Sequence, residues 1–254
     1  MKTLPRAALG VGAIVAVLGI LQGLASLGVS RLKYLPEPTE VFAAGGGLVG
    51  TGEFWNAVGH TAWVSLLGWL IGSAVAVVVG TAVGLSRHAQ IWSMSTLDIF
   101  RAIPVVAVLP VMVLVLGLTT RMEMYLVVYA CLWPVLLNTV AGVSGVNRAL
   151  HDVGRTLHLG RPATLFKIVL PGSTAQIAVG VNLSLGISLV VSVIAEIIAT
   201  PAGVGHEVTM AQSALDPPRM FAYIAVSGLL GILFSYGLHL LYGRVRPGIL
   251  EARR

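Results

Sequence analysis

Residues Ser173 to Thr200 read STAQIAVGVNLSLGISLVVSVIAEIIAT, and this stretch decides the fold class. It contains one charged side chain, Glu196, and no lysine or arginine. About 20 predominantly apolar residues are enough for a helix to cross the hydrocarbon core of a bilayer. The stretch therefore predicts a transmembrane helix.

Five further stretches have a similar length and composition. They are Ala7 to Leu27, Ala57 to Leu85, Ile99 to Leu118, Tyr125 to Val143 and Phe221 to Tyr242. Charged side chains make up only 10% of the chain and the mean hydropathy is +0.91, which excludes a soluble enzyme. We expect one all-α, polytopic membrane domain over residues 1–254, with about six transmembrane helices. A cleaved secretory signal is the alternative for the first stretch, although its apolar run is longer than a typical signal core.

The basic residues predict the orientation of these helices. With a cytoplasmic N-terminus and six spans, twelve of the sixteen lysines and arginines fall on the cytoplasmic side. This excess obeys the positive-inside rule, so both termini are expected in the cytoplasm. The formal charge of +6 then reflects insertion topology and argues against a nucleic-acid partner. This assignment puts Glu123 outside the bilayer and leaves Glu196 as the single acidic residue within a span.

Motifs for catalysis, cofactors and metals are missing from the sequence. None of the three lysines follows a glycine, so the chain has no phosphate-binding loop and is not expected to hydrolyse ATP. His206 and Glu207 begin like a zinc-protease signature, but Met210 stands where its second histidine belongs. His151 and His158 lie seven residues apart without a third ligand nearby. We therefore predict no catalytic, cofactor or metal site in this chain.

The longest polar segment reads NRALHDVGRTLHLGRPATLFKIVLP, from Asn147 to Pro171. Leu150, Val153 and Leu157 form one stripe of an amphipathic helix. Gly160 is expected to end this helix, and Pro171 is expected to break a second one before the next span. Such a hairpin suits a groove on a soluble partner, while an interfacial hairpin against lipid headgroups is the alternative.

This segment resembles the cytoplasmic motif of permease subunits of bacterial ABC importers. That motif is Glu-Ala-Ala, three residues, Gly, nine residues, then Ile-x-Leu-Pro. The aligned residues here keep every spacing, and they are Asp152, Val153, Gly154, His158, Ile168, Leu170 and Pro171. The end of the motif is intact. Asp152 stands in place of the leading glutamate, and His158 stands in place of the glycine. The histidine puts the bend expected at this turn in question.

Three other segments are similar to permeases for nitrate, taurine and aliphatic sulfonates. They are Tyr34 to Val41, Phe100 to Pro104 with the following Leu109-Pro110, and Ala195-Glu196 before Gly203-Val-Gly205. The resemblance covers about residues 34–242. It implies an ATP-driven importer in the bacterial inner membrane, built from a permease homodimer, a cytoplasmic ATPase dimer that uses ATP and Mg²⁺, and an extracytoplasmic solute-binding protein. Stand-alone secondary transporters or channels, and membrane anchors of signalling assemblies, are the competing classes.

Under this resemblance the hairpin transmits ATPase closure to the helices. The residues expected to couple are Leu150, Asp152, Val153, Gly154, Arg155, Leu157 and His158.

Polar residues within the spans are candidates for the translocation path or its gate. They are Asn138, Asn182, Ser184, Ser188, Ser192 and Glu196. The three serines recur every four residues and so share one helix face. Hydrogen bonding between helices is the alternative role for each of them. The spacings Gly68-x-x-x-Gly72 and Gly80-x-x-x-Gly84 predict close helix packing, and Pro104 and Pro110 predict a kinked or divided third span.

Overall fold

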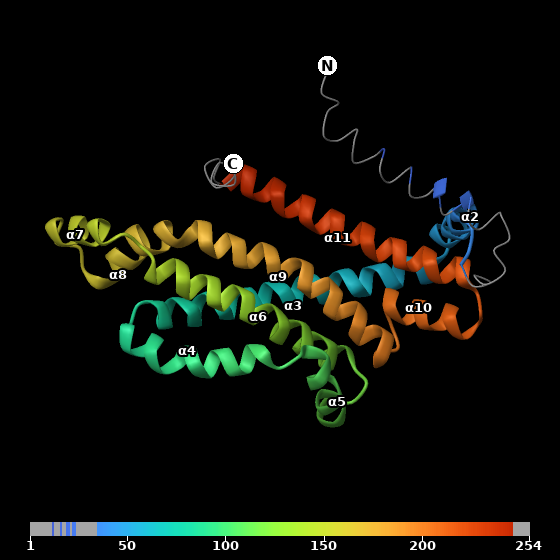
Figure 1. The fold of residues 1–254 in the computed structure, drawn as a ribbon, viewed down its shortest axis with the longest axis horizontal. Helices are drawn as coiled ribbons and strands as arrows, with labels where there is room; N and C mark the ends of the chain where they lie inside the picture. The colour runs from blue at the N-terminus through green and yellow to red at the C-terminus, as the bar shows by residue number, and fades with distance from the viewer. Residues whose placement is uncertain (1–11, 13–15, 17–18, 21, 24–34, 246–254) are drawn as a thin grey trace, which may run out of the picture.

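The computed structural model describes residues 12, 16, 19–20, 22–23 and 35–245, and the regular elements among them are all helical (Figure 1). The helices are α2 (Pro38–Val49), α3 (Gly52–Gly84), α4 (Arg87–Ala102), α5 (Val105–Leu116), α6 (Thr120–Ser144), α7 (Arg148–Thr156), α8 (Arg161–Thr164), the π-helical turn η1 (Leu165–Val169), α9 (Leu170–Ile198), α10 (Val204–Ser213) and α11 (Pro217–Val245). The predicted all-α fold is confirmed.

The described residues contain four helices that are long and apolar enough to span a membrane. They correspond to the second, fourth, fifth and sixth predicted spans. The third span is a bent pair in which α4 and α5 meet at 82°, giving up to five spans. Pro104 caps the start of α5, so this proline divides the span, as predicted, whereas Pro110 lies inside α5. Most of the first predicted span lies outside the described residues, so the count of six stays a prediction.

Helices α3, α6 and α9 form the centre of the bundle (Figure 1). The glycine spacings in α3 allow the close approach to α6 that the sequence predicts. A Cβ atom on Gly68 would lie 2.6 Å from Cγ1 of Val127, and one on Gly80 would lie 2.8 Å from Cβ of Thr139. Because these distances are too short for side-chain contacts, only glycine permits this helix spacing.

The connections gather at two ends of the bundle (Figure 1). Helices α7 and α8 lie at one end, and α2 and α10 lie at the opposite end. These are called the α7 end and the α10 end below. Side-chain caps start several helices: Thr51 accepts from the Phe54 N–H at the start of α3, and Thr119 accepts from the Met122 N–H at the start of α6. Glu37 caps α2.

Two features of the predicted hairpin are wrong in detail. Pro171 does not break the helix, because α8, η1 and α9 run on as one helical segment. The π-helical turn η1 ends at Val169, two residues before this proline. Because proline has no N–H, one regular helix hydrogen bond is missing here, and the helix widens to the π form. Gly160 does not end the first helix either, since α7 ends at Thr156 and Gly160 caps α8.

Candidate functional site

Helix α7 presents an apolar surface away from the bundle. Leu150, Val153 and Leu157 are 45%, 51% and 64% exposed. Phe166 of η1 is also exposed, at 68%. Asp152 and Arg155 are exposed beside them and lie 3.5 Å apart, a distance too long for a strong ion pair. The structure therefore brings the predicted coupling residues together on one hairpin, where all of them except Gly154 are exposed.

Gly154 and His158 fix the geometry of this hairpin. Gly154 is buried, and a Cβ atom there would lie 2.8 Å from Cδ1 of Ile168, so α7 and η1 pack closely at this glycine. His158 follows the end of α7 with φ +51°, in the left-handed region. The bend expected at this position is thus kept, although a histidine holds it at a steric cost that glycine would avoid.

A buried polar cluster lies where α3, α6 and α9 meet, near the α10 end. The Glu196 carboxylate accepts hydrogen bonds from the Thr61 hydroxyl at 2.7 Å and from the Gly205 N–H at 2.8 Å. Thr61 also accepts from the Val204 N–H at 2.9 Å. Glu196 is 1% exposed, so this side chain does not reach the interface with water. Its bonds join α9 to α3 and to the first turn of α10.

Glu123 completes this cluster, and it lies within α6, which begins at Thr120, five residues before the predicted span that starts at Tyr125. It is fully buried in α6, and its Oε1 accepts from the Ser192 hydroxyl at 2.7 Å. Its Oε2 lies 2.9 Å from Nε2 of His60. Because Glu123 follows Thr119, Thr120 and Arg121, the sequence gives it the appearance of an interfacial residue. His60, Thr61 and Glu123 were therefore missed, and no local sequence signal marks their meeting with Glu196.

The turn before α10 is built around the Glu196 carboxyl group. Gly203 has φ +95°, and a Cβ atom there would overlap this carboxyl group. A Cβ atom on Gly205 would lie 2.8 Å from Cβ of Glu196. Two amides of this turn carry the partial positive charge of a helix N-terminus, so a carboxylate is favoured here. The Gly-Val-Gly segment is thus required by the fold around Glu196.

The predicted serine stripe is buried inside the chain. Ser184, Ser188 and Ser192 are 0% exposed. Ser184 and Ser188 donate to carbonyls of their own helix, at 2.9 and 2.8 Å. Asn138 accepts from Nε2 of Gln176 at 2.8 Å, which joins α6 to α9, and Asn182 is half-buried. These positions favour helix packing for the serines, and a role in the path stays a prediction.

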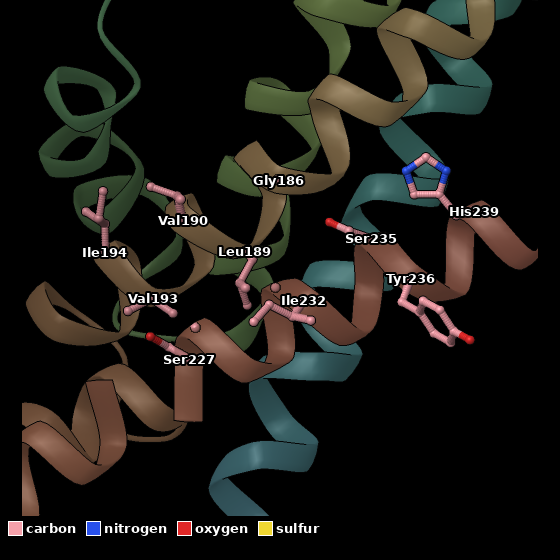
Figure 2. A pocket seen from close by; sticks show the side chains of 12 residues that line it. Gly186, Leu189, Val190, Val193, Ile194, Ser227, Ile232, Ser235, Tyr236 and His239 are labelled. Atoms are coloured by element: carbon pink, nitrogen blue, oxygen red, sulfur yellow. The ribbon is translucent and has the colours of Figure 1, made fainter. Parts of the chain in front are cut away.

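A groove of about 770 Å³ lies between α9 and α11 (Figure 2). Its walls are mostly apolar, with Leu189 and Val190 of α9 facing Ile232 of α11. The polar side chains of Ser227, Ser235, Tyr236 and His239 follow one another along α11. Only 11% of the most apolar stretch of α11 is buried inside the chain, the smallest buried share among the four spans.

Comparison with known proteins matches residues 68–250 to the family described as the binding-protein-dependent transport system inner membrane component. This match covers more than half of the chain. The chain belongs to this family of ABC permeases. The charge-poor spans and the exposed α7 hairpin are therefore those of a permease component.

Curated relatives cover most of this permease. The putative aliphatic sulfonates transport permease SsuC of Bacillus subtilis is 28% identical over 89% of this chain and 82% of its own. The taurine transport system permease TauC of Escherichia coli is 28% identical over 94% of this chain and 89% of its own. A probable ABC transporter permease of Brucella melitensis is 30% identical over 79% of this chain and 82% of its own.

Solved structures support the permease fold. A chain of an amino acid ABC transporter superposes with a TM-score of 0.60 at 16% identity, covering 74% of this permease and 92% of that chain. A chain of the MetNI methionine ABC transporter superposes with a TM-score of 0.57 at 13% sequence identity. The superposition covers 72% of this permease and 94% of that chain. At these identities the likeness concerns the fold alone.

Proposed function

We propose that this permease is the translocation subunit of an ATP-driven importer, with a cytoplasmic ATPase docked on the α7 hairpin. In this arrangement the α7 end is cytoplasmic and the α10 end faces the solute-binding protein. ATP and Mg²⁺ are bound by the ATPase, and this chain undergoes alternating access without catalysing hydrolysis.

The exposed stripe of α7 is the observation that carries the proposal. Leu150 and Val153 on this nine-residue helix and Leu157 at its C-cap are about half exposed or more, and they lie on one side of a short amphipathic helix. An amphipathic helix of this kind buries its apolar face in a groove of a partner. Gly154 packs α7 onto η1, and η1 continues into α9, so a push on α7 reaches a central helix of the bundle.

A second copy of the permease is the proposed cover of the groove between α9 and α11. Ser235 and His239 are exposed on α11, and polar or ionisable groups within a span normally face protein or water, since lipid cannot hydrogen-bond to them. Apposition of two such grooves would enclose these side chains between subunits. The homodimer therefore accounts for the exposed polar side chains along this face of α11.

The proposed solute is a small sulfonate, taurine or nitrate. The relatives named above for aliphatic sulfonates and taurine support this class, as does a nitrate import permease of Leptolyngbya laminosa that is 24% identical over 77% of this chain and 70% of its own. Binding of labelled taurine, an alkanesulfonate and nitrate to the solute-binding protein encoded with this permease tests the assignment.

Aspartates in the stripe test the docking itself. We expect the double variant Val153→Asp, Leu157→Asp to lose co-purification with the ATPase, because two buried carboxylates without partners oppose docking. Thr156→Asp adds one carboxylate at an exposed polar position of the same helix and should retain the ATPase. Equal retention by both variants in membranes with equal permease content would overturn the proposed site.

A further inference from the structure

Three side chains with metal-binding atoms converge near the α10 end. They are His60 of α3, Glu123 of α6 and Glu196 of α9, and one ligand atom from each lies within 4.8 Å of the other two. We propose that this cluster binds a divalent transition-metal ion, and that Zn²⁺ fits it. The ion would join the three central helices. The inference concerns this chain alone and does not depend on the proposed transport function.

The charge of the cluster calls for a cation. Glu123 and Glu196 are 0% and 1% exposed. Within the described part of the chain, the sole ion-pair partner of either carboxylate is His60. A protonated His60 leaves one negative charge in excess, whereas a divalent ion bound to a neutral His60 balances both carboxylates. A buried carboxylate keeps its charge when it is paired or bound to a metal, and otherwise it takes up a proton.

The contact between His60 and Glu123 also requires a proton or a metal ion between the two atoms. Nε2 of His60 and Oε2 of Glu123 are 2.9 Å apart. A bare imidazole nitrogen and a carboxylate oxygen repel each other at this distance, so either a proton or a metal ion must lie at their contact. A proton serves these two groups alone. A metal ion also recruits Glu196, the third group of the cluster.

The carboxylates retain acceptor capacity for an ion. Two ionised carboxylates offer about eight acceptor positions. Among the described residues, five contacts occupy them, from His60, Thr61, Gly205 and, twice, Ser192. About three positions have no donor. The same hydroxyl and amide donors hold the carboxylates in place, as outer hydrogen bonds do for the ligands of protein metal sites.

The ligand types select the ion. Zn²⁺ binds both imidazole nitrogen and carboxylate oxygen, whereas Mg²⁺ and Ca²⁺ prefer ligand sets made of oxygen alone. The His60 side chain is 18% exposed while both carboxylates are enclosed, so an ion can enter on the histidine side.

Zinc binding by the purified full-length permease tests the proposal. The protein carries a purification tag without histidine, is stripped with a chelator, receives Zn²⁺ and is desalted before its metal content and its dissociation constant are measured. We expect one Zn²⁺ per wild-type chain. His60→Gln and Glu123→Gln should each weaken binding at least tenfold. His88→Gln, at an exposed histidine of α4, is the matched control and should leave the dissociation constant unchanged.

X-ray absorption of the wild-type protein keeps the proposal testable if a variant fails to fold. Nitrogen and oxygen ligands at about 2.0–2.2 Å are expected. Sulfur at about 2.3 Å would assign the zinc to Cys131, the single cysteine, and would overturn the proposal. Wild-type protein that retains no more Zn²⁺ than Glu123→Gln would overturn it as well and would leave a shared proton at the cluster. Equal retention of Mg²⁺ would contradict the selection of a transition metal.

Discussion

Replacing Thr61 by valine should destabilise the bundle far more than the size of the change suggests. Valine keeps the shape of threonine but removes the donor to Glu196 at 2.7 Å and the acceptor for the Val204 N–H at 2.9 Å. Two average hydrogen bonds between membrane helices would be worth about 1.2 kcal/mol. Here the Glu196 carboxylate loses one of its donors and the buried Val204 N–H loses its acceptor, and each loss costs about 1–3 kcal/mol. We expect a loss of about 3 kcal/mol in the free energy of unfolding.

Thr139→Val is the matched control. Thr139 is also 0% exposed, but its hydroxyl donates only to the Val135 carbonyl of its own helix. That carbonyl keeps its regular helix bond when the hydroxyl is lost, so the cost should stay below about 1 kcal/mol.

Cys131 provides the assay. It is the single cysteine of the chain and is fully buried, so its reaction with a maleimide dye reports opening of the bundle in detergent. A loss of about 3 kcal/mol raises the open fraction roughly 150-fold. Equal labelling rates in the two valine variants would refute the reasoning, because burial alone would then explain both threonines.

Three further changes have expected outcomes. Gly203→Ala should lower the free energy of thermal unfolding by about 2 kcal/mol or more, because its φ is +95° and a methyl group would meet a buried carboxyl group. Gly59→Ala is the control, since its methyl group would meet no atom within 4 Å, and it should be neutral within about 0.5 kcal/mol. His158→Gly should relieve left-handed strain by a net of about 0.5 kcal/mol and slow deuterium exchange at the hairpin about twofold; faster exchange would contradict this. Ser235→Cys should give cross-linked dimers with a bifunctional thiol reagent in membranes. Leu114→Cys, at a position of α5 that is 87% exposed, should give none. Equal dimer yields would argue against the groove as the subunit interface.

The sequence predicts those parts of the fold that depend on local pattern. Apolar length located α3, α6, α9 and α11, and the glycine spacings anticipated how closely α3 and α6 pack. The amphipathic stripe at Leu150, Val153 and Leu157 located the hairpin. Each of these signals lies within a few turns of one helix, where hydropathy and spacing have a direct structural meaning.

The polar cluster depends on contacts between distant residues, and it escaped prediction for that reason. Thr61 and Glu196 meet across 135 positions of the chain, and Glu123 and Ser192 meet across 69. A threonine in an apolar span or a glutamate in the first turn of a helix has an ordinary local explanation. For the serine stripe, a role in the path stays a prediction, because period alone does not tell whether a polar face lines a path or packs against a neighbouring helix.

ATP-dependent uptake in proteoliposomes tests the central claim most directly. The vesicles contain this permease with the ATPase encoded beside it, and the solute-binding protein is supplied outside with its labelled solute. The account predicts uptake with ATP in the lumen, none with a non-hydrolysable analogue and none when any of the three proteins is omitted. Uptake by the permease alone, driven by an ion or solute gradient, would contradict the account and identify a stand-alone transporter.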